Sequence, residues 1–83
     1  MDAKLINFYF EQNGFKKKFN KVYFNYIRGE YDVKILAIES KIIISHLNNI
    51  IFETGLPKNE GSIVKWINIL INKYEKESNQ TDS

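Results

Sequence analysis

The chain has 83 residues, of which 43% are hydrophobic and 27% are charged, and its net charge at pH 7 is +2. A chain of this length and composition forms one small globular domain with a small core. It has no cysteine and a single histidine, His46, which excludes disulfide scaffolds and both cysteine-ligated and multi-histidine metal sites. We therefore expect one domain over residues 1–78, a flexible polar tail over residues 79–83, and no metal or cofactor.

The first residues do not have the pattern of a targeting signal. Met1–Lys4 includes an acidic residue, and no apolar stretch of the length of a signal peptide or a membrane span follows. We therefore expect a cytoplasmic protein that makes no membrane contact.

Residues 2–13 have the pattern of a short amphipathic helix. Asp2 can cap the first turn, and Leu5, Phe8 and Tyr9 recur at helical spacing. Gly14 predicts the end of this helix, because glycine readily adopts the left-handed conformation that often follows a last turn.

The next segments, residues 19–27 and 31–38, predict the two strands of a β-hairpin. β-branched and aromatic residues dominate both segments, and residues 28–30 supply the turn. A hairpin alone is unstable in water, so we expect it to pack on a helix or on a further strand.

Residues 39–54 fit two patterns, and we favour a helix over a strand. Ser40 can cap a helix, and residues 55–57 (Gly-Leu-Pro) form a strong stop signal. The apolar residues that would share one helical face are Ile43, Leu47, Ile50 and Ile51. In the alternative, residues 41–45 form a strand, and a turn at the following asparagines leads into a return strand over residues 50–52.

Residues 60–77 predict a second long helix with a broad apolar stripe. The stripe consists of Ile63, Val64, Trp66, Ile67, Leu70, Ile71 and Tyr74. The predicted fold is therefore a small two-layer α+β domain with the element order α-β-β-α-α, or α-β-β-β-α in the alternative. The second order matches the topology of double-stranded RNA-binding domains.

The usual catalytic constellations are missing from the sequence. Ser45 and His46 are neighbours, and adjacent side chains point apart on a strand and about 100° apart on a helix, so they do not form a nucleophile–base pair. No glycine-rich phosphate loop occurs, and the acids Glu30 and Asp32 flank a turn, where carboxylates are usually solvated. We therefore expect a protein that is not an enzyme.

The segment Phe15–Arg28 combines basic and aromatic residues and contains no acid. Residues 1–28 carry six basic and two acidic side chains, a net +4, whereas the remaining residues carry a net −2. Lysines neutralise phosphates, and aromatic side chains can stack on unpaired bases. The candidate binding residues are Lys16, Lys17, Lys18, Lys21, Tyr23 and Arg28. In the alternative interpretation, the lysines form a solvated loop and the aromatic residues form the core.

On the predicted strand 19–27, alternate side chains face opposite sides. The side expected to face the core carries Val22, Phe24 and Tyr26. The side expected to face outward carries Lys21, Tyr23 and Asn25.

Two stretches resemble known families. Residues 11–16 (Glu-Gln-Asn-Gly-Phe-Lys), after a short helix, resemble the start of HicA-type toxin ribonucleases, although the Gly-Ser/Thr-His motif that carries the histidine of that family is missing. The run from Asp32 to Tyr74 is similar in outline to ribbon-helix-helix repressors, with a strand, a helix that ends near residues 53–56, a turn and a second helix. That resemblance implies that alternate side chains of the strand enter a DNA groove.

These observations favour a small regulatory protein that binds nucleic acid through its basic and aromatic hairpin. The alternative is a stoichiometric inhibitor or adaptor, such as a phage or mobile-element protein that blocks a nucleic-acid-processing or defence machine of the host. A homodimer is a further possibility, for which Trp66 and the isoleucine-rich helix would supply apolar surface.

Overall fold

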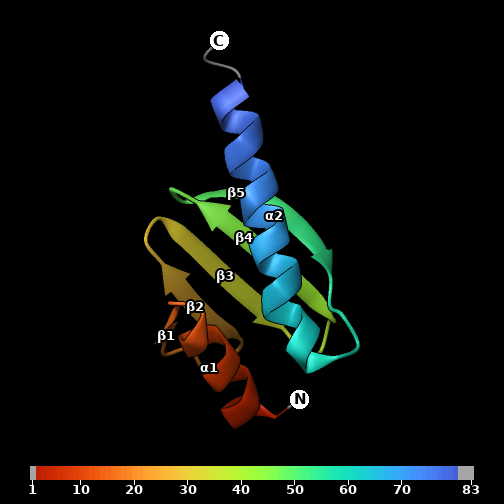
Figure 1. Cartoon of the computed structure of the whole chain (residues 1–83). Coiled ribbons are helices and arrows are strands. Elements are labelled where there is room, and N and C mark those ends of the chain that lie inside the picture. Colours follow the sequence, from red (N-terminus) through yellow and green to blue (C-terminus); the bar gives the residue numbers. More distant parts are fainter. Residues whose placement is uncertain (1, 81–83) are drawn as a thin grey trace.

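The computed structural model describes residues 2–80 and shows a two-layer α+β domain, as the sequence predicts (Figure 1). The elements are α1 (Ala3–Gln12), β1 (Lys16–Lys18), β2 (Phe24–Arg28), β3 (Tyr31–Leu36), β4 (Lys41–His46), β5 (Asn49–Gly55) and α2 (Glu60–Gln80). The strands form one antiparallel sheet in the order β1-β2-β3-β4-β5, so each strand pairs with its neighbour in sequence. Both helices cover the same face of this sheet, which leaves its other face open (Figure 1).

Local signals determine the two ends of α1. The carboxylate of Asp2 accepts hydrogen bonds from the backbone N–H groups of Lys4 (3.0 Å) and Leu5 (3.3 Å), which satisfies donors that the first turn leaves unpaired. Gly14 follows the last turn with φ of +82°, in the left-handed region. The predicted cap and the predicted stop are therefore both confirmed.

The core lies between the sheet and the two helices. Phe10 of α1 stacks face to face on Tyr26 of β2, with ring centroids 3.9 Å apart and an interplanar angle of 3°. The fully buried residues of the sheet and α2 continue this layer, and they include Val33, Ile35, Ile42, Ile44, Ile63, Ile67 and Ile71. Trp66 is half-buried and packs against the same core.

The first strand of the predicted hairpin begins five residues later than expected. Residues 19–23 form a loop, because the side chain of Asn20 accepts hydrogen bonds from the N–H groups of Val22 (2.8 Å) and Tyr23 (3.1 Å) and bends the chain. Val22 is consequently 83% exposed and not in the core. Asn25 lies on the sheet face opposite Tyr26, as expected, but it is buried there, with its amide donating to the backbone carbonyl of Val33.

The favoured helix over residues 39–54 is wrong, because this segment forms β4 and β5. A two-residue turn joins the strands, and Leu47 (φ +51°) and Asn48 (φ +68°) both adopt the left-handed conformation that such turns need. The isoleucines are dense enough to satisfy helical spacing and strand alternation together. Pairing of β4 with β3 over six residue positions decides in favour of the strand.

The observed strands differ from the ribbon-helix-helix outline and from the topology of a double-stranded RNA-binding domain. A ribbon-helix-helix outline needs a helix before residue 56, and that segment is β5. The topology of a double-stranded RNA-binding domain would need three strands, and this sheet has five. One of the additional strands is β1. It consists of Lys16–Lys18, which the alternative interpretation of the sequence placed in a solvated loop.

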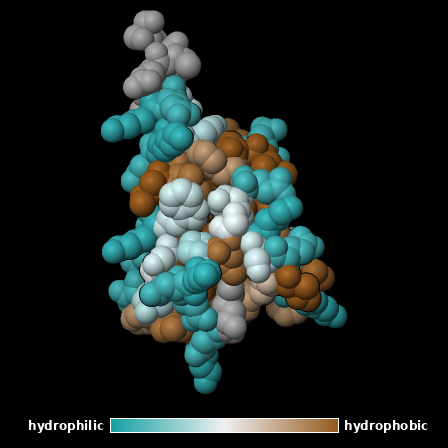
Figure 2. Space-filling model, turned by 90° about the vertical axis from the view of Figure 1, so that its right-hand side faces the viewer, coloured by the Kyte–Doolittle hydropathy of each residue, from teal (hydrophilic) through white to brown (hydrophobic). Residues whose placement is uncertain are grey.

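The second predicted helix is confirmed as α2, which continues to Gln80. It therefore includes residues 79 and 80, and the rest of the expected tail, residues 81–83, lies outside the described residues. Within residues 2–80, no helix combines the length and apolarity that crossing a membrane requires. Viewed from the side of β5, the end of α2 beyond the sheet is hydrophilic, whereas hydrophobic residues gather on the body of the domain (Figure 2).

Burial raises the pKa of Tyr26 to about 12, and the charge of Glu11 adds to the shift. The neutral phenol is the form that the folded state stabilises, so this contribution is complete below pH 10 and is lost as the pH rises from 10 to 12. Between pH 9 and pH 11, we expect the free energy of unfolding to fall by about 1.4 kcal/mol more in the wild type than in Tyr26→Phe. Urea unfolding followed by Trp66 fluorescence measures both values, and parallel pH profiles of the two proteins would contradict the prediction.

Candidate functional site

Three of the candidate lysines form β1, an outer strand of the sheet. Lys16 pairs with Ile27 and Lys18 pairs with Asn25, so the two lysines lie on the open face, whereas Lys17 points to the other face. All three are exposed. The sheet therefore carries a row of ammonium groups along one edge.

The position of this row depends on Phe15, the residue that precedes it. The Phe15 ring is buried and lies edge-on against Phe10, with centroids 5.2 Å apart. Its backbone N–H donates to the carbonyl of Phe10 (3.0 Å), directly after Gly14 has turned the chain. The chain thus leaves α1 with one fixed direction and enters the sheet in register with β2.

Arg28, the sixth candidate residue, stabilises the turn between α1 and β1. Its guanidinium lies over the Phe15 ring, 4.3 Å from the centroid, and donates through Nη1 to the backbone carbonyl of Asn13 (3.0 Å). Arg28 is also half-buried. Its charge therefore stabilises the turn between α1 and β1 and is not presented together with the lysines.

The loop between β1 and β2 adds a fourth lysine and an aromatic ring. Lys21 is exposed at the bend that Asn20 stabilises, and Tyr23 follows as the chain returns to the sheet. The ammonium group of Lys34, on β3, lies 5.8 Å from the centre of the Tyr23 ring. The structure thus brings together five of the six candidates, and we call Lys16, Lys17, Lys18, Lys21 and Tyr23 the basic corner.

A hollow opens beside the basic corner, between the loop after β1 and the turn between β3 and β4. Residues within 17–24 form one side and residues 35–39 form the other, and the volume of this open hollow is about 320 Å³. We call it the corner hollow. Much of its lining is apolar, and two of these side chains, Val22 (83% exposed) and Ile38 (100% exposed), have almost no cover.

The lysines of the basic corner take part in none of the ion pairs found within residues 2–80. In this part of the chain, Lys41 forms a salt bridge with Glu53 (2.8 Å) and His46 contacts Glu30 (3.3 Å), and neither contact uses a lysine of the basic corner. The Glu53 carboxylate raises the pKa of Lys41 by hydrogen bonding and by its charge. The lysines of the basic corner therefore remain available for an anionic partner.

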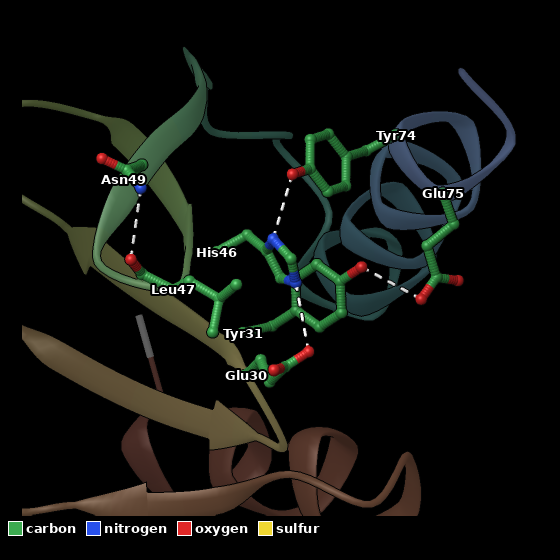
Figure 3. Close-up of polar contacts among 7 residues, drawn as sticks. All are labelled: Glu30, Tyr31, His46, Leu47, Asn49, Tyr74 and Glu75. Carbon is green, nitrogen blue, oxygen red and sulfur yellow. Dashed lines mark hydrogen bonds and ion pairs between the residues drawn. The ribbon is translucent and has the colours of Figure 1, made fainter. Parts of the chain in front are cut away.

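A second cluster of polar residues surrounds His46 at the opposite end of the sheet (Figure 3). Its Nδ1 lies 3.0 Å from the Tyr74 hydroxyl of α2, and its Nε2 lies 3.3 Å from a carboxylate oxygen of Glu30. Tyr31 stacks at a tilt against the imidazole, and its hydroxyl donates to Glu75 (3.0 Å).

This His46 cluster joins α2 to the sheet. An ionised carboxylate only accepts hydrogen bonds, so in the neutral ring Nε2 carries the proton and Nδ1 accepts from Tyr74. Both ring nitrogens are therefore engaged within the fold. Burial, together with the carboxylate of Glu75, raises the pKa of Tyr31 to about 12, which keeps this phenol a neutral donor.

Sequence reasoning found the lysines but missed the corner hollow. Its second side, which includes Leu36 and Ile38, comes from a different hairpin, and no local pattern connects that segment with the loop at Asn20. The one usable signal was Asn20 itself, because an asparagine side chain often stabilises a turn by bonding to the backbone two residues further on. Tyr74 was assigned to the apolar stripe, and nothing in the sequence indicated its contact with His46.

No protein-family model matches the chain, and comparisons with curated proteins and with solved structures found no significant similarity. The basic corner must therefore be interpreted from its own chemistry.

We expect Arg28→Gln to lower the free energy of unfolding by about 1–3 kcal/mol, because it removes a charged hydrogen bond and a contact between a cation and an aromatic ring. Lys21→Gln is the matched control, since an exposed loop lysine should change stability by less than about 0.5 kcal/mol. Urea unfolding of both variants checks the difference. Equal stabilities would show that Arg28 does not support the turn.

Proposed function

We propose that this chain is a non-catalytic regulatory protein that binds nucleic acid through the basic corner. The observation that carries the proposal is the set of four exposed lysines on one outer strand and the loop that follows it, a segment without any acid. Ammonium groups placed in this way neutralise successive phosphates, and the release of condensed counterions then favours binding.

The strand geometry supports contact with more than one phosphate. Lys16 and Lys18 lie on the same face, two residues apart, which separates their backbone positions by about 7 Å. Lys21 extends the row beyond the end of β1. Because lysine side chains are long and flexible, the row can follow a nucleic-acid backbone without a bend in the sheet.

A triple substitution, Lys16→Gln with Lys18→Gln and Lys21→Gln, tests the site. Each lysine contact contributes about 0.7 to the slope of log affinity against log salt on a single strand, so we expect the slope to become shallower by about 2. Fluorescence anisotropy with labelled DNA and RNA strands, titrated with salt, measures it.

The matched control is Lys65→Gln with Lys73→Gln and Lys76→Gln, which removes the same charge from exposed positions of α2. We expect this control to retain the wild-type slope. Equal losses in both triple variants would contradict the site, and no binding by the wild type at low salt would contradict the function.

A stoichiometric protein-binding inhibitor or adaptor is the second candidate. It is favoured by the outer face of α1, where Leu5 (39% exposed) and Phe8 (53% exposed) lie one turn apart and away from the sheet. We expect Leu5→Asn with Phe8→Asn to abolish an equimolar complex that the wild type forms with its partner, whereas the lysine variant would retain it. Light scattering of the recovered complex gives the stoichiometry, and a complex that survives the α1 substitutions contradicts this candidate.

A further inference from the structure

The corner hollow is an apolar surface that the fold leaves uncovered next to its most basic segment. Val22 and Ile38 line it from two different loops, and Tyr23 and Leu36 also line it. Burying such side chains against a ligand is favourable, because it removes apolar surface from water. The hollow therefore favours a ligand that has an apolar surface and negative charges close beside it.

We propose that the corner hollow binds an unpaired base of single-stranded nucleic acid while the lysines of the basic corner bind the phosphates on either side of it. This inference rests on the proposed function and specifies its ligand. An unpaired base presents a flat π-face, and each nucleotide supplies a phosphate next to that face. A single strand thus combines the two chemistries that lie side by side here.

Two polar residues of the hollow, Asn20 and Glu39, can form hydrogen bonds with the edge of a base. Asn20 uses its carboxamide oxygen within the loop, at 2.8 Å from the N–H of Val22, so its NH₂ group is the part that can donate to a base. Glu39 lies on the other side, and its carboxylate can accept from a base N–H, such as N3–H of thymine. Because Glu39 repels phosphates, the backbone of the strand is directed toward the side formed by Lys17, Lys18 and Lys21.

A duplex does not fit this surface equally well. Its bases are stacked and paired, and only their edges are accessible in the grooves. Val22 and Ile38 would then meet sugars and phosphates, and their apolar surface would remain exposed or would be buried against charge. The lysines could still bind a duplex, but the corner hollow would contribute nothing to its affinity.

Three labelled probes separate the contribution of the base from that of the phosphates. They are a ten-nucleotide thymidine strand, an abasic strand with the same number of phosphates, and a ten-base-pair duplex. Stacking contributes about 1–3 kcal/mol per base, so we expect the thymidine strand to bind about 5-fold to 150-fold more tightly than the abasic strand. Fluorescence anisotropy at low salt measures the three dissociation constants.

The double variant Val22→Asn with Ile38→Asn tests whether this preference arises in the hollow. Both side chains are exposed in loops, so the fold should persist, which circular dichroism verifies. We expect the thymidine-to-abasic ratio to fall toward one while the affinity for the abasic strand stays unchanged. Leu47→Asn is the matched control, because Leu47 is also exposed but lies in a turn at the opposite end of the sheet.

The possible failures are distinguishable. Equal binding of all three probes, with the dependence on the lysines intact, would overturn the base-binding inference and leave the proposed function standing. The same holds for tighter binding of the duplex and for a thymidine preference that survives the double variant. No binding of any probe would overturn both, and a protein partner retained by the wild type but lost in the double variant would then assign the hollow to protein binding.

Discussion

The burial of the Phe15 ring is the constraint on which the basic corner depends. The ring lies between Phe10 and the Arg28 guanidinium, and Gly14 gives the chain the turn that brings it there. A strand of three lysines has little tendency of its own to join a sheet, because like charges repel and lysine has low strand propensity. Its pairing with β2 is thus a consequence of the anchored residue before it.

The meander topology then gives the two ends of the sheet different roles. The loop after β1 and the turn after β3 lie at the same end, because every strand pairs with its sequence neighbour. That end carries the corner hollow with its exposed apolar and basic side chains. At the other end His46, Tyr31 and Tyr74 join the sheet to α2 through hydrogen bonds and ring contacts. One end is therefore consolidated within the fold, and the other leaves its basic and apolar side chains exposed.

The sequence predicted the fold where local interactions decide it. Both helices were correctly placed because the Asp2 cap, Gly14 and the apolar stripe of α2 act within a few residues. Residues 39–54 were assigned to the wrong element because their isoleucines satisfy both periodicities, and only pairing with β3 separates the two. The lysines were recognised as candidates from their charge, but nothing local indicated that they form a strand.

The sequence by itself determined the fold class, a small two-layer α+β domain. Its length limits the domain to one small core, its lack of cysteine and its single histidine limit the chemistry, and its charge concentrates in the first third. Only the tertiary structure decided that Arg28 packs on Phe15, that β4 and β5 extend the sheet, and that Val22 and Ile38 line one hollow. The physical reason is that these outcomes depend on contacts between segments distant in sequence, and such contacts leave no local periodicity to read.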